Sequence, residues 1–172
     1  IKNMIPTKIL EKNRLELDFK SNIPTGYGLK SSSAISSAVI LSCAKVFGKK
    51  ISDDEILQLG AKTSIQTKVS ITGAYDDACG CHFGGFNVTD NLKMKLIHRE
   101  LAPKDLQAII FLPKSRKRGN LKRLKEFYTA FEKSWELAKK SDYWNAGILN
   151  GIATTSILDS EPKLIMRLIE KG

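Results

Sequence analysis

The sequence predicts a protein of the α+β class. Three observations lead to this prediction: a period-2 apolar pattern near the N-terminus, an uncharged stretch of small and aliphatic residues after it, and later stretches with helical spacing. The 172 residues, of which 42% are hydrophobic and 27% charged, suit one domain or one and a half. This balance argues against wholesale disorder.

The N-terminal part is expected to contain one strand and two helices. Apolar and charged side chains alternate over residues 15–19, which is the pattern of a strand with one solvent-exposed face. The uncharged stretch 31–44 predicts a helix buried on all sides, with its leading serines as N-caps. Ser52 and Glu55 have the spacing of a capping box, so a second helix is expected from there to about residue 67.

The middle of the chain is expected to form a loop and three strands. The loop, which has room for a short helix, covers residues 69–82 and ends at the Gly84–Gly85 pair. Two strands are expected at 86–89 and 94–98, with a turn at residues 90 and 91 between them. The β-rich run 108–112 is a third strand candidate.

The C-terminal part is expected to be mostly helical. Apolar residues at 3- and 4-residue spacing predict an amphipathic helix over 121–138, and Ser141 with Asp142 caps another helix through about residue 157. Ser160 is the expected cap of a third helix, with Pro162 in its first turn. We expect a boundary between two subdomains near residues 100–105.

The chain carries 28 basic and 18 acidic residues, for a net charge of +10. No apolar run approaches the ~20 residues that cross a bilayer, so a membrane-spanning chain is not expected. Three cysteines and no export signal at the N-terminus suit the reducing cytoplasm. The segment 114–125 holds seven basic residues and no acid. It has three interpretations: a solvated loop, a contact for anionic ligands, or a nucleic-acid surface, the last disfavoured because no aromatic residues are interleaved.

The junction 24–34 is the strongest candidate for chemistry. It joins the predicted strand to the N-terminus of the uncharged helix, where unpaired N–H groups and the helix dipole favour an anion. Gly26 and Gly28 allow close backbone approach, Lys30 adds a cation, and the serines 31–33 offer hydroxyls to phosphate or Mg²⁺. The alternative is a glycine turn into a serine-capped core helix. The spacing is neither that of the common P-loop nor a complete dinucleotide fingerprint.

A second candidate is the pair of adjacent carboxylates, Asp76 and Asp77, in a loop of small residues. Adjacent carboxylates are costly unless they are exposed, paired or bound to a metal. One interpretation is a base that orients a hydroxyl nucleophile with the help of Mg²⁺. The other is the acidic first turn of a helix.

Together these two segments resemble the GHMP superfamily of small-molecule kinases. The ATP loop of that family has the form P-x-x-x-G-L-x-S-S-x-A, which is matched in order by Pro24, Gly28, Leu29, Ser31, Ser32 and Ala34. Its later segment, a Ser/Thr–Gly pair, an acid and a Gly–Gly turn, is similar to Thr72–Gly73, Asp76 and Gly84–Gly85. The segments GLKSSSA (residues 28–34) and TGAYDDA (residues 72–78) resemble those of the archaeal-type shikimate kinases within the superfamily.

The resemblance implies a fold and an activity. It implies a ribosomal-protein-S5-like ATP-binding part over residues 1–102, and the start of a ferredoxin-like α/β domain over 103–172. It implies transfer of phosphate from ATP, with Mg²⁺, to a hydroxyl of a small metabolite, shikimate giving shikimate 3-phosphate in aromatic amino-acid biosynthesis. Homoserine and mevalonate are the alternative substrates, and a basic nucleic-acid-binding domain ranks lower. The family's N-terminal segment and late Gly-rich motif are absent, so we expect residues 1–172 alone to be inactive as a kinase. Oligomeric state is not indicated.

The resemblance also assigns roles to individual residues. Ser32 is implied as the Mg²⁺ ligand, and Asp76 matches the catalytic acid best by position, with Asp77 as the alternative. The position near Ser64, where many members carry a Mg²⁺-binding Glu, is not an acid. The remaining assignments are an ATP loop of Pro24, Gly26, Gly28, Leu29, Lys30, Ser31, Ser32 and Ser33, and substrate contacts at Thr72, Gly73, Arg116 and Asn150.

Overall fold

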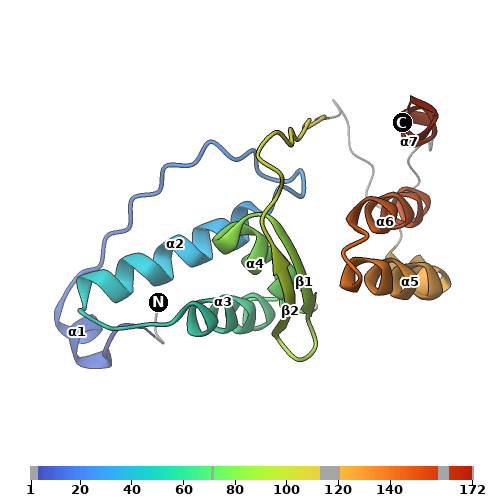
Figure 1. Ribbon diagram of the computed structural model, residues 1–172. Helices are drawn as coiled ribbons and strands as arrows, with labels where there is room; N and C mark the ends of the chain where they lie inside the picture. Colours follow the sequence, from blue (N-terminus) through green and yellow to red (C-terminus); the bar gives the residue numbers. More distant parts are fainter. Residues whose placement is uncertain (1–3, 71, 113–120, 159–162, 172) are drawn as a thin grey trace. The chain divides into compact units, whose positions relative to one another are not determined.

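The computed structural model describes residues 4–70, 72–112, 121–158 and 163–171 and divides into two compact units, Ile1–Asp105 and Leu106–Gly172 (Figure 1). Helices and a small antiparallel sheet occur in the same chain, which confirms the α+β class. The assignment of 1–102 and 103–172 to two kinase domains stays a prediction.

The first unit contains four helices, α1 (Thr7–Lys12), α2 (Ser31–Val46), α3 (Asp53–Gln66) and α4 (Tyr75–Phe83). Helices α2, α3 and α4 pack against one another, as Figure 1 shows. Two apolar clusters hold them together. One is formed by Met4, Ile5, Ile40, Cys43, Ala44 and Ile56, and the other by Leu57, Ala61, Tyr75, Ala78 and Cys79. Helix α3 contributes to both clusters and therefore links them.

The predicted capping box of α3 is confirmed. The Glu55 N–H donates to Ser52 Oγ at 3.3 Å, and the Ser52 N–H donates back to the Glu55 carboxylate at 2.8 Å. The hydrogen bonds that the Ser52 N–H and the Ser52 hydroxyl donate to the Glu55 carboxylate lower the pKa of Glu55 below its usual value, because they favour its ionised form. The helix ends at Gln66, close to the expected residue 67.

Helix α2 is present as predicted but differs in two respects. One of its faces is buried, whereas Leu41 and Val46 on the rest of its surface are 44% and 75% exposed, so burial on all sides is wrong. The serines are not its N-caps. The helix already includes Ser31, so the N-cap is Lys30. The Lys30 side chain makes no capping hydrogen bond. The serines 31–33 therefore lie in the first turn.

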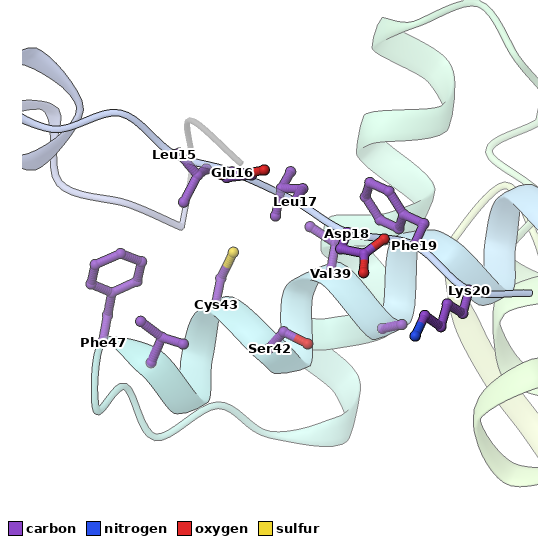
Figure 2. Close-up of a pocket in the computed structure, with 12 residues that line it drawn as sticks. Leu15, Glu16, Leu17, Asp18, Phe19, Lys20, Val39, Ser42, Cys43 and Phe47 are labelled. Atoms are coloured by element: carbon purple, nitrogen blue, oxygen red, sulfur yellow. The ribbon is translucent and has the colours of Figure 1, made fainter.

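The strand predicted at 15–19 is wrong. Residues 15–20 are extended and exposed, and they run along α2 with a cavity of about 340 Å³ between them (Figure 2). No described strand lies beside this segment, since the sheet of the described residues has only the two strands of a later hairpin. A strand requires a hydrogen-bonding partner, which the alternating pattern alone does not supply.

The predicted hairpin is confirmed as β1 (Phe86–Asp90) and β2 (Lys95–Glu100), paired antiparallel with an irregularity between Val88 and Thr89. Gly84 ends α4 as expected. Gly85 has a φ of +68°, and a Cβ there would overlap the carbonyl oxygen of Glu100, so the close approach of β2 requires glycine. The third strand predicted at 108–112 is wrong: this run has no regular structure, and Ile109 is 96% exposed.

The second unit consists of helices. A 3₁₀ helix, η1 (Leu121–Phe127), precedes α5 (Tyr128–Lys139), so the amphipathic helix predicted from 121 is α-helical only in its second part. Asp142 caps α6 (Tyr143–Ile157) as predicted, and α6 packs on α5. Helix α7 (Lys163–Lys171) follows, with its predicted Ser160 cap and Pro162 outside the described residues. No helix in the described parts of the chain has the length and apolar character needed to cross a membrane.

Candidate functional site

The loop before α2 has a backbone suited to binding an anion. Its φ angle is positive at every second residue, at +82° for Gly26, +77° for Gly28 and +60° for Lys30. Backbones that alternate in this way turn successive N–H groups toward one concave side, where they can bind phosphate oxygens. The loop leads directly into the first turn of α2, whose N–H groups and dipole add to the same effect.

A cavity of about 340 Å³ opens beside this loop. Its walls come from the loop, the first turn of α2, the end of α3 with the segment that follows it, and the first turn of α4. The lining residues are Gly28, Leu29, Lys30, Ser31, Ser32, Ser33, Ser64, Val69, Ser70, Ala74 and Asp77. The structure thus brings Leu29 to Ser33 of the predicted ATP loop together with one of the two predicted acids, Asp77. Pro24 and Gly26 precede the lining residues.

A tight turn followed by a buried tyrosine sets the direction of α4. Gly73 has a φ of +84° and Ala74, the N-cap, adopts the left-handed conformation. Tyr75 is 1% exposed and its hydroxyl donates to Asp54 of α3 at 3.3 Å. Burial raises the pKa of Tyr75, so this hydroxyl stays protonated. Because Tyr75 is fixed in the core, the next two residues of α4 are directed away from it.

Asp77 points into the cavity and pairs with the loop. Its carboxylate lies 3.0 Å from the Lys30 ammonium, and its side chain is 17% exposed. Burial raises the pKa of Asp77 above its usual value; the hydrogen bond from Lys30 opposes this shift, and the charge of Asp76 adds to it. The Cys81 thiol, one turn further along α4, contacts the Lys30 carbonyl at 3.9 Å. Helix α4 and the loop are therefore joined at two points.

Asp76 has different partners. Its backbone N–H donates to Asn91 Oδ1 at 3.0 Å, and Asn91 Nδ2 donates to the Asp76 carboxylate at 2.7 Å. The Thr89 hydroxyl donates to the same Asn91 oxygen at 2.9 Å. Asn91 lies at the tip of the β1–β2 hairpin and caps α4 in place of Ala74, which has no side chain able to do so. The sequence did not predict this role, because it indicates only that Asn91 belongs to the turn between two strands.

The donor set in the cavity fits a hard cation bound together with phosphate. Ser32 of α2 offers a hydroxyl and Asp77 of α4 a carboxylate to the same cavity, and Mg²⁺ prefers such oxygen ligands. Ser64 also lines the cavity, and its hydroxyl donates to the Gly60 carbonyl at 3.0 Å. Among the residues that the structure describes, no three His, Cys, Asp or Glu side chains gather as a metal site of their own.

Thr72 and Gly73, the predicted substrate contacts in the same unit as this cavity, are not among its lining residues. Thr72 is exposed, and Gly73 packs on α3, where a Cβ would lie 3.1 Å from the Ala61 carbonyl oxygen. Asn150 is an exposed residue of α6 in the second unit. Arg116 and most of the basic segment 114–125 lie outside the described residues. The role of all four residues in substrate binding stays a prediction.

Comparison with known proteins gives a consistent result. Residues 2–85 match the family described as GHMP kinases N terminal domain. The shikimate kinase of Methanosarcina acetivorans is 36% identical over 95% of this chain and 58% of its own length. Those of Archaeoglobus fulgidus and Pyrococcus furiosus are 38% and 31% identical, over 91% and 92% of this chain and 56% and 59% of their own.

The chain thus spans little more than half the length of these curated relatives. No solved structure is significantly similar to it. The family match covers the loop, α2, α3 and α4, the same elements that enclose the cavity. Residues 2–85 therefore match the GHMP kinase family, and the chain as a whole is similar to archaeal shikimate kinases.

Proposed function

We propose that the protein transfers the γ-phosphoryl group of ATP to a hydroxyl of shikimate and gives shikimate 3-phosphate. The observation that carries this proposal is the cavity in which an anion-binding loop and helix N-terminus face one carboxylate, Asp77. The similarity to archaeal shikimate kinases supports the choice of substrate. The same proposal places the protein in the cytoplasm. It assigns an S5-like fold to residues 1–102 and a ferredoxin-like α/β fold to the domain that includes residues 103–172.

In this proposal the loop and the start of α2 hold the phosphates. The N–H groups of residues 28–33 and the Lys30 ammonium would neutralise the phosphate oxygens, and the serine hydroxyls would donate to them. Mg²⁺ bound with ATP would compensate the charge on the transferring phosphoryl group. Ser32 is the residue that would hold it, while Ser64, near the position where the family resemblance implies an acid, offers only a hydroxyl. Catalysis of this kind depends on positioning and electrostatics.

We assign proton acceptance to Asp77. As the substrate oxygen forms its bond to the γ-phosphorus, its proton passes to the Asp77 carboxylate and ADP departs with the electrons of the broken bond. Burial raises the pKa of Asp77, which makes its carboxylate a stronger proton acceptor. Asp76 matches the family's acid by position, but its carboxylate is bound by Asn91 and it does not line the cavity.

A matched pair of substitutions tests the assignment. Because the chain covers little more than half of its relatives, the assay uses the full-length gene product, with shikimate, homoserine and mevalonate as acceptors and ADP release as the readout. Asp77→Asn is expected to lower kcat with shikimate by about 10²- to 10⁴-fold, the usual contribution of general acid–base catalysis. Asp76→Asn, with the same change of charge one residue away, is expected to lower kcat less than about tenfold.

Two outcomes would contradict the proposal. Turnover that survives Asp77→Asn but is lost in Asp76→Asn would move the proton acceptor to Asp76. Turnover with homoserine or mevalonate and none with shikimate would replace the substrate, while no turnover with any of the three would overturn the kinase activity as proposed.

A further inference from the structure

Lys30 forms an ion pair with a carboxylate of α4. Its ammonium is 3.0 Å from the Asp77 carboxylate, and both residues line the same cavity. Lys30 is half-exposed, at 52%, whereas Asp77 is only 17% exposed. The cation is therefore the more solvent-exposed partner of this pair, and the carboxylate is the more buried one.

The backbone of Lys30 places this cation at the start of α2. Lys30 is the N-cap residue, with φ 60° and ψ 28°, a left-handed conformation that is unfavourable for a residue with a side chain. Its side chain makes no capping bond to α2 and reaches α4 instead. The ammonium is thus attached to the end of the helix where backbone N–H groups would bind phosphate oxygens.

We infer that Lys30 is a movable counter-ion shared between Asp77 and the polyphosphate of the nucleotide. Without nucleotide, Lys30 pairs with Asp77. When the polyphosphate binds, its larger negative charge draws the ammonium away and leaves the Asp77 carboxylate without this partner. The identity of the anion rests on the proposed function, whereas the ion pair itself is a feature of the structure.

The energies involved make this exchange feasible. The ion pair is exposed on its Lys30 side, where solvent screens it and ordering the lysine side chain costs entropy, so the pair is weaker than a fully buried one. A hydrogen bond between an ammonium and phosphate oxygens is charge-assisted and stronger than a neutral one. Binding of the polyphosphate therefore frees the Asp77 carboxylate from its counter-ion.

A double-mutant cycle tests the exchange without measuring catalysis. The dissociation constant of Mg²⁺-free tripolyphosphate is measured by calorimetry for wild type, Asp77→Asn, Lys30→Met and the double variant of the full chain. Lys30→Met is expected to weaken binding at least threefold. Asp77→Asn is expected to strengthen binding, because Lys30 no longer has to leave a partner. This gain should be at least three times larger when Lys30 is present than in the Lys30→Met background.

Two further variants separate charge from backbone effects. Lys30→Gly removes the ammonium but suits the positive φ, so it should bind like Lys30→Met; Lys30→Arg keeps the charge and should retain the coupling. Equal gains from Asp77→Asn in both backgrounds, or no loss of affinity in Lys30→Met and Lys30→Gly, would overturn the inference. Phosphoryl transfer to shikimate does not enter this test, so its failure and the failure of the proposed function are distinguishable.

Discussion

Substitution of Gly73 by alanine tests how the turn before α4 is built. The φ of Gly73 is +84°, which for alanine costs about 1–2 kcal/mol. The added Cβ would lie 3.1 Å from the Ala61 carbonyl oxygen and 3.2 Å from Ile65 Cδ1. The first neighbour is backbone of α3 and cannot move alone, so overpacking should add about 1–2 kcal/mol. We expect Gly73→Ala to lower the free energy of unfolding by about 2–4 kcal/mol.

Gly48→Ala is the matched control, because Gly48 has a similar φ of +61° but nothing within 4 Å of its Cβ position. It should lose only the conformational part, about 1–2 kcal/mol. Urea titration followed by far-UV circular dichroism measures both variants, and hydrogen exchange of α3 and α4 amides reports the first unit directly. An equal loss in the two variants would refute the packing argument. A shift of α4 should also displace Asp77, so kcat of Gly73→Ala should fall more than that of Gly48→Ala.

Three further predictions follow from the contacts described above. Asn91→Ala removes the cap of α4 and should lower the free energy of unfolding by about 1 kcal/mol, with faster exchange of the first α4 amides measured by NMR; unchanged exchange would exclude the capping role. Ser52→Ala should similarly cost about 1 kcal/mol in urea titrations, since it breaks the capping box of α3. The raised pKa of Asp77 means that the folded chain holds this proton more tightly than the unfolded chain does. Its contribution to stability is therefore present below the ordinary pKa of aspartate and is lost as pH rises through the raised value. Asp77→Asn should remove this component from the unfolding free energy measured across that pH range, and an unchanged pH dependence would contradict it.

Structures determined by neighbouring residues were predictable from the sequence. The capping box depends on Ser52 and Glu55, which are three residues apart, and the hairpin depends on two short runs joined by a turn. The runs 15–19 and 108–112 have equally good β patterns and are not strands in the structure. Their state depends on a partner strand elsewhere, and a pattern within one segment contains no information about that partner.

The same distinction applies to the candidate site. The loop and the acid pair stand out in the sequence because each is a compact run. The choice between Asp76 and Asp77 depends on the tertiary contacts of each carboxylate, which are made by Asn91, 15 residues away, and by Lys30 on another element. Ser64 reaches the cavity only through the packing of α3. No spacing rule predicts such contacts, because they depend on how whole helices pack.

The extended segment 15–20 has a consequence for how the chain behaves at high concentration. In the described structure, Leu15, Leu17 and Phe19 are 40%, 37% and 52% exposed, and the segment belongs to no sheet. An extended stretch of alternating apolar residues is a template on which a second chain can add a β-strand. The acids Glu16 and Asp18 between them repel an identical copy, which works against self-association. Replacement of both acids by neutral residues should therefore favour self-association of this segment near neutral pH.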